Sequence, residues 1–153
     1  MKSLIIILFL LFYIASADFA STSLLEKVEK KYNKFAKNRF VALNNLLQKL
    51  QNADTKTKLE KINDFFNSVK YGDDKDIYGT SDYWANPYEF LARDKGDCED
   101  YVIAKYFALR HLGIPSSKMC LSYVTIDGST NAHMVLTYFE TPNSEPLVLD
   151  SIR

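Results

Sequence analysis

The chain has 153 residues, of which 47% are hydrophobic and 14% aromatic, which is ample for one folded core and too apolar for a largely disordered chain. Lysine plus arginine and aspartate plus glutamate each number 19, so the formal net charge is zero. A balanced charge gives no indication of a nucleic-acid partner. We therefore expect a single domain that does not bind nucleic acid.

The first 17 residues have the pattern of an export signal. Lys2 is followed by an apolar run over residues 4–14, and residues 15–17 are the small residues Ala-Ser-Ala. The run is shorter than the about 20 apolar residues that a transmembrane helix needs. The sequence predicts a signal peptide over 1–17 and a mature domain over 18–153, with an uncleaved anchor as the alternative.

Two helical patterns come next, followed by an irregular segment. Apolar residues recur at helical spacing from Leu24 to Leu50, and a further helix is expected from a cap at Asp54 or Thr55 to about Lys70. Residues 71–95 show no regular period and are rich in aromatic side chains. Such a segment either lines a groove or seals the core, and the sequence leaves both open.

The second half of the chain predicts one helix and a sheet. A helix is expected from about Cys98 to Leu112, where Gly113 and Pro115 give the usual stop signal. Strand patterns, rich in β-branched and aromatic residues, cover 119–126, 132–139 and 147–150. Because helices come first and neighbouring strands follow, the fold class is α+β with an antiparallel sheet.

Cys98 is the candidate nucleophile, because it lies where a loop becomes a helix. A cysteine in the first helical turn faces unpaired N–H groups and the positive end of the helix dipole, both of which stabilise a thiolate. Gly96 allows a sharp, close approach of the backbone at that entrance. The acids Asp97, Glu99 and Asp100 oppose a thiolate unless they point away or a cation such as Ca²⁺ neutralises them. Acids are also ordinary stabilisers of a first helical turn.

One of the two histidines and one aspartate complete a possible catalytic set. His133 begins an apolar strand, and Asp150 closes the last one. Cysteine on a helix, histidine on a strand and an acid on the next strand is the chain order expected of Cys-His-Asp hydrolases. A symmetric hairpin would place Asp150 opposite Leu136, about 10 Å along the strand from His133. We therefore expect an offset register, a bulge or a bend.

The second cysteine, Cys120, leaves a different reading open. Export favours disulfides, so a Cys98–Cys120 bridge is the alternative to a free nucleophile. The surroundings argue against it, since Cys98 lies in an acidic turn and Cys120 in an alternating apolar segment.

The segment YWANPYEFLARDKGDCEDYVIAKYFALRHLGIP, together with AHMVL and PLVLDS, resembles the bacterial transglutaminase-like cysteine proteinases of the LapG type. The resemblance covers roughly residues 59–150 and implies a papain/transglutaminase-like fold with N-terminal helices packed on an antiparallel sheet. It implies Cys98 as nucleophile, His133 as general base and acid, and Asp150 as the orienting acid. It also implies that Asp97, Glu99 and Asp100 bind the Ca²⁺ on which such enzymes depend.

The resemblance further implies a periplasmic endopeptidase that cleaves the N-terminal region of a large surface adhesin and so promotes biofilm dispersal. An inner-membrane cyclic-di-GMP receptor is the implied regulatory partner. Because the aromatic segment directly precedes the nucleophile, we expect Tyr83, Trp84 and Tyr88 to wall the substrate groove.

Two departures from the family pattern affect this expectation. Members usually continue with further strands, whereas this sequence ends at Arg153, and Ser151 stands where they usually have asparagine. We therefore expect a domain truncated at its C-terminus. The alternatives are a catalytically inactive binding module and a transglutaminase-type acyl transferase.

Overall fold

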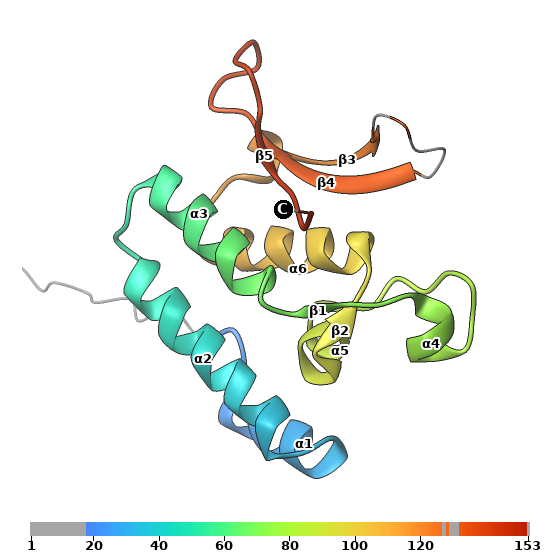
Figure 1. Cartoon of the computed structure of the whole chain (residues 1–153). Helices are drawn as coiled ribbons and strands as arrows, with labels where there is room; N and C mark the ends of the chain where they lie inside the picture. The colour runs from blue at the N-terminus through green and yellow to red at the C-terminus, as the bar shows by residue number, and fades with distance from the viewer. Residues whose placement is uncertain (1–17, 127, 129–131, 153) are drawn as a thin grey trace, which may run out of the picture.

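The computed structural model describes residues 18–126, 128 and 132–152, so the predicted signal peptide lies outside the described part. Within that part, no helix combines the length and the hydropathy needed to cross a bilayer. In Figure 1 the helices form the lower part of the molecule and a small sheet lies above α6.

The N-terminal region contains three helices rather than the two expected. The pattern from Leu24 to Leu50 is divided into α1 (Thr22–Lys31) and α2 (Lys34–Leu50), which correct the prediction of one helix. The division falls at Asn33, whose side chain accepts a hydrogen bond from the N–H of Ala36 at 2.9 Å and so starts α2.

The next helix, α3 (Thr55–Phe66), begins where the sequence indicated. The Asp54 carboxylate accepts from the Thr57 N–H at 2.9 Å, which confirms the predicted cap. The helix ends at Phe66 and not near Lys70, because residues 70–71 form strand β1 (Lys70–Tyr71) instead.

The segment 71–95 is more ordered than its sequence suggested. It holds two short helices, α4 (Asp74–Tyr78) and α5 (Pro87–Arg93), and is followed by β2 (Lys95–Gly96), which pairs in parallel with β1. Asn86 and Glu89 form a capping box at the start of α5, with Pro87 in its first turn. This pairing places Gly72, just before α4, beside Gly96, two residues before the helix that begins at Cys98.

The second half follows the predicted order. Helix α6 (Cys98–His111) leads through a short 3-10 turn, η1 (Ser116–Lys118), to β3 (Met119–Thr125), β4 (Ala132–Tyr138) and β5 (Leu147–Leu149). The strands form an antiparallel sheet in the order β3-β4-β5, which confirms the α+β class.

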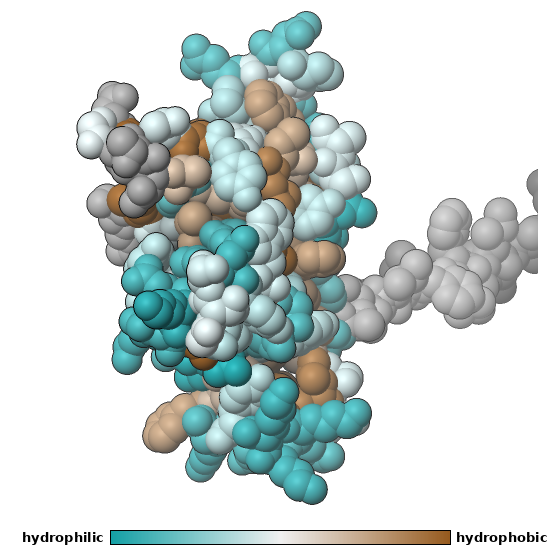
Figure 2. Space-filling model, turned by 90° about the vertical axis from the view of Figure 1, so that its right-hand side faces the viewer, coloured by the Kyte–Doolittle hydropathy of each residue, from teal (hydrophilic) through white to brown (hydrophobic). Residues whose placement is uncertain are grey.

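Helix α6 is the centre of the core, with α3 and α5 on one side and β4 on the other. Its buried residues pack with apolar side chains of every layer, including Phe40, Phe66, Phe90 and Leu136. Full burial of one such side chain contributes about 1.5–3 kcal/mol, so the core fixes the orientation of α6. In Figure 2, brown hydrophobic residues lie among hydrophilic ones and gather mostly in the upper part of that face, where the sheet lies.

Candidate active site

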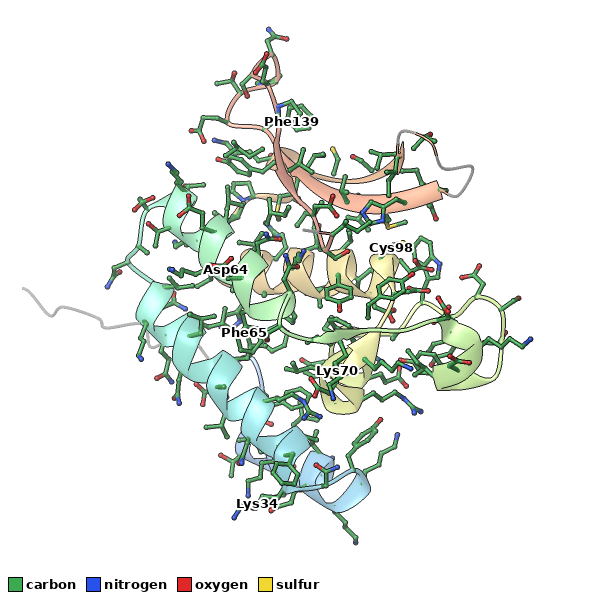
Figure 3. All side chains as sticks on the ribbon, in the orientation of Figure 1. Lys34, Asp64, Phe65, Lys70, Cys98 and Phe139 are labelled. Carbon is green, nitrogen blue, oxygen red and sulfur yellow. The ribbon has the colours of Figure 1, made fainter. Side chains whose placement is uncertain are left out.

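Cys98 is the first residue of α6, directly beneath β4 (Figure 3). The backbone N–H of Met134, the residue that follows His133 in β4, acts to lower the pKa of the Cys98 thiol. The thiol donates to the Glu99 carboxylate at 3.1 Å. The start of the helix and the start of β4 are therefore joined at the sulfur atom.

The other two predicted residues are brought together at the start of β4. His133 is buried, and its Nε2 lies 2.7 Å from the Oδ1 of Asp150. An ionised carboxylate can only accept, so Nε2 carries the hydrogen and Nδ1 keeps a free lone pair. This tautomer leaves one ring nitrogen able to take a proton from a thiol.

The expected offset between the last two strands is present. Leu136 pairs with Leu149, so a continued ladder would place Asp150 opposite Val135. Strand β5 ends at Leu149, and the chain bends at Ser151, directly after Asp150. The bend, together with the length of the imidazole side chain, allows the Asp150 carboxylate to reach His133.

The predicted calcium ligands fall into two groups rather than one. Asp97 and Asp100 bring their oxygens within 4.8 Å of Asp74, and Glu99 does the same with Asp74 and Asp82. Asp74 and Asp82 were not among the residues predicted from the sequence. Their signal was the run of acids between Gly72 and Tyr83, but nothing local shows that this loop folds against residues 97–100.

Three carboxylate oxygens of this cluster are buried without a hydrogen-bond partner in the described structure: Asp74 Oδ1, Asp97 Oδ1 and Asp100 Oδ2. The second oxygens of Asp74 and Asp100 are held by backbone N–H groups of Tyr83 and Ala85, the latter at 2.8 Å. Each of these two carboxylates is thus fixed at one oxygen and leaves the other facing a neighbouring acid. Hard oxygen ligands in this arrangement suit Ca²⁺.

The acids are not acting as ordinary helix stabilisers. Asp97 occupies the N-cap position of α6, yet its side chain makes no capping hydrogen bond. Asp100 lies in the first turn but is fully buried, where a solvated helix-stabilising acid would be exposed. This geometry favours the cation reading over the one based on the helix dipole.

Without a cation, the cluster opposes ionisation. Burial, with added repulsion from neighbouring acids, raises the pKa of Asp97 to about 8 and that of Asp100 to about 6. Burial also raises the pKa of the Cys98 thiol to about 12, helped by its hydrogen bond to Glu99. The expected stabilisation of a thiolate by the helix start is therefore outweighed in the cation-free chain.

Gly96 has the role that the sequence indicated. A Cβ at this position would lie 2.5 Å from Asp100 Oδ2 and 2.5 Å from a ring carbon of Phe90. Real contacts of this kind stay above 3.0 Å, so a side chain at residue 96 would displace the Asp100 carboxylate. The glycine is required for close packing, as expected.

The three aromatic residues assigned to the substrate groove do not lie together. Trp84 and Tyr88 line a cavity of about 420 Å³ with Ile103 and Phe107 of α6. Tyr83 is not among the lining residues, and its ring lies against Tyr78, with centroids 4.2 Å apart. At about 100° per residue, Ile103 and Phe107 lie about 140–180° around α6 from its first residue. This cavity therefore opens on the side of the helix away from the thiol.

Both cysteines are free, so the bridge between Cys98 and Cys120 is not formed. Cys120 is exposed in β3, where it pairs with Thr137. His111, the other histidine, packs edge-on against Phe19 and takes no part in the cluster around Cys98.

A helix-borne cysteine against an antiparallel sheet, with a histidine–carboxylate pair at the adjoining strand ends, defines a protein of the transglutaminase-like cysteine proteinase fold. The chain belongs to the bacterial transglutaminase-like cysteine proteinase family, whose model matches residues 25–153. Comparison with curated proteins gave no match.

Solved structures of LapG from Legionella pneumophila are similar in both sequence and fold. The EGTA-treated form is 41% identical with a TM-score of 0.76, over 90% of this chain and 74% of that one. The calcium-bound form is 42% identical with a TM-score of 0.75, over 87% of this chain and 74% of that one. These likenesses confirm the family resemblance and the predicted fold.

Proposed function

We propose that the mature chain is a calcium-dependent cysteine endopeptidase of the periplasm that cleaves the N-terminal region of a large surface adhesin. The observations that carry this proposal are the Cys98 thiol at the start of α6 and a buried His133 in β4 that is paired with Asp150 at 2.7 Å. Membership in a cysteine proteinase family and 41% identity to LapG support it.

The residues divide the chemistry among them. The Cys98 sulfur attacks the carbonyl carbon of the scissile peptide bond, while His133 takes the thiol proton at Nδ1. His133 then gives that proton to the leaving amine, which leaves an acyl group on the Cys98 sulfur. Water next attacks this thioester while His133 takes a proton from the water, and the proton returns to the sulfur as the acid product leaves. Asp150 holds the ring in the tautomer with hydrogen on Nε2 and stabilises the imidazolium that forms.

Asp74, Asp97 and Asp100 would hold the calcium ion, with Asp82 and Glu99 as a second set that shares Asp74. When bound, Ca²⁺ supplies positive charge that cancels the repulsion among these acids beside the thiol. The three unpartnered buried oxygens are what support this assignment, along with the calcium-bound form of LapG. Asp74 extends the ligand set expected from the sequence.

The location and the partners follow from the family resemblance. The predicted signal over 1–17 would deliver the chain to the periplasm. There, a cyclic-di-GMP receptor of the inner membrane would sequester the protease and so control release of the adhesin and biofilm dispersal. Cell fractionation and binding of the receptor's periplasmic domain test these two points.

The decisive experiment incubates the purified mature chain with the N-terminal domain of a large adhesin encoded by the same organism. Cleavage should occur in Ca²⁺, stop in chelator, and be absent in Cys98→Ala. Binding without cleavage by the wild type would favour the inactive binding module. Incorporation of a fluorescent primary amine in place of hydrolysis would favour the acyl transferase.

A further inference from the structure

The backbone carbonyl of Asp150 is held from behind by two side chains that the chemistry above does not use. Asn67, at the end of α3, donates to it through Nδ2 at 2.8 Å. Lys105, in the middle of α6, donates to it through Nζ at 3.1 Å. Side chains from the end of α3 and from α6 therefore both bind the backbone of Asp150, whose carboxylate is hydrogen-bonded to His133.

Lys105 lies on the same side of α6 as the thiol. It follows Cys98 by seven residues, close to two full turns at 3.6 residues per turn, so both side chains face the sheet. Lys105 is fully buried, which is rare for lysine.

Burial of this lysine is unfavourable by itself. It lowers the pKa of Lys105 to about 7, opposed only by the charge of Asp150, and its Nζ also lies 5.8 Å from the ring centroid of Tyr101. A methionine would fill the same space without this cost. A polar cluster has nevertheless formed here, since Asn63 Oδ1, Asn67 Oδ1 and Ser151 Oγ are also buried, with no partner in the described structure.

These polar side chains lie where the chain bends after β5. The strand register alone would leave Asp150 opposite Val135, and its carboxylate reaches His133 only because the chain leaves the sheet at Leu149. The Asp150 carbonyl is the first backbone acceptor after the strand, and both donors meet there.

We propose that Lys105 and Asn67 are positioning residues that fix the bend after β5 and so hold the Asp150 carboxylate on His133 Nε2. This inference rests on the proposed function, in which Asp150 sets the tautomer of His133. Neither residue touches the reacting atoms.

The test compares Lys105→Met and Asn67→Ala with the matched control Asn44→Ala. Asn44 is also a buried asparagine that ties down a backbone segment, through two hydrogen bonds to Ala20, but it lies in α2, which is not part of the active-site cluster. The first readout is the ¹⁵N spectrum of the imidazoles, which reports the tautomer without any substrate. The chain has only two histidines, so a His111→Gln variant assigns the His133 signals.

The expected result is a mixed His133 tautomer in Lys105→Met and Asn67→Ala, and one tautomer, with hydrogen on Nε2, in wild type and Asn44→Ala. In the cleavage assay kcat should fall about 100-fold with KM within about twofold, as for a small misplacement of a catalytic group. A wild-type tautomer and wild-type kcat in both variants would overturn the inference, even if both were less stable.

The two proposals fail separately. If the wild type cleaves nothing but the variants still mix tautomers, the positioning role stands and the proposed protease function is wrong. If Lys105→Met does not fold, Asn67→Ala alone decides, because it removes the shorter of the two hydrogen bonds and leaves the buried charge in place.

Discussion

The two sides of the first turn of α6 are built in opposite ways. On the sheet side, the His133 ring is hydrogen-bonded to the Asp150 carboxylate, which also accepts from the backbone N–H of Ile152 at 3.0 Å. On the loop side, Asp74, Asp97 and Asp100 each leave a buried oxygen without a partner in the described structure. The polypeptide therefore supplies hydrogen-bond partners on one side of the turn and leaves buried carboxylate oxygens without them on the other.

The difference indicates how calcium would control such a site. Buried polar atoms without partners cost about 1–3 kcal/mol each, and more when they are charged. A bound cation would remove this cost, and Ca²⁺ is the chemistry that suits three carboxylates. Because Cys98 and Glu99 join the two sides, a change in the acid cluster reaches the thiol directly.

Removing the sheet-side histidine should have the largest effect. His133→Ala should lower kcat/KM on the adhesin domain by at least about 10⁴-fold, because neither the thiol proton nor the leaving amine then has a partner. The melting temperature should fall less than for a substitution in the apolar core, since His133 is buried near the start of β4 but lies outside the hydrophobic cluster. Cys120→Ala is the control, and it should keep full activity because Cys120 is exposed and unbridged. Normal cleavage by His133→Ala would end the triad assignment.

On the loop side, Asp74→Ala should remove calcium binding. Asp74 is the one acid shared by both carboxylate groups, so its loss breaks each of them. Isothermal titration should show no calcium binding, and added Ca²⁺ should neither raise the melting temperature nor support cleavage. The control is Asp76→Ala, an exposed acid of the same helix outside both groups. Wild-type calcium affinity in Asp74→Ala would show that the calcium site does not include Asp74.

The sheet side was predictable from the sequence, whereas the loop side was only half predictable. Cys98, His133 and Asp150 each follow a local boundary signal, namely a helix start, a strand start and a strand end. Asp74 has no such signal, because it joins the cluster through tertiary contacts with a residue 23 positions later, Asp97. The same limit applies at Asn33: apolar spacing continues through it, and its cap hydrogen bond to Ala36 is what divides the helices.

Strand register is a second feature that the alternation of apolar residues could not predict. Alternation placed β4 and β5 correctly but could not distinguish pairing of Leu136 with Leu149 from pairing one residue away. Two of the donors to the Asp150 backbone carbonyl, Asn67 and Lys105, are 83 and 45 residues distant in sequence. Nothing near Asp150 in the sequence indicates these donors.

The acid cluster should also make the calcium-free chain less stable as the pH rises. The pKa values of Asp97 and Asp100 are raised from 3.8 to about 8 and about 6, so the folded chain holds these protons more tightly than the unfolded chain. Their contribution is therefore fully present below pH 3.8 and lost as pH rises through about 6 and then about 8. Melting temperatures in calcium-free buffer should fall across this window. Saturating Ca²⁺ or Asp97→Asn should flatten the slope, and an equal slope with and without Ca²⁺ would contradict the cluster's role.

The smallest expected effect comes from the glycine that separates the two sides. Gly96→Ala would place a methyl group 2.5 Å from Asp100 Oδ2 and from the Phe90 ring, both of which are buried. Relief requires shifting a packed ring or the buried Asp100 carboxylate, so we expect a loss of about 1–3 kcal/mol of unfolding free energy. Gly72→Ala is the matched control, because Gly72 pairs with Gly96 through a 2.9 Å backbone hydrogen bond. The three atoms nearest to its added methyl all belong to the flexible Lys95 side chain, with Cε at 2.0 Å, which can move aside. Denaturant unfolding compares the two, and calcium affinity separates their causes: Gly96→Ala should weaken it and Gly72→Ala should not. Equal stability and equal affinity in both variants would show that the Asp100 carboxylate can shift freely, which a rigid ligand set does not allow.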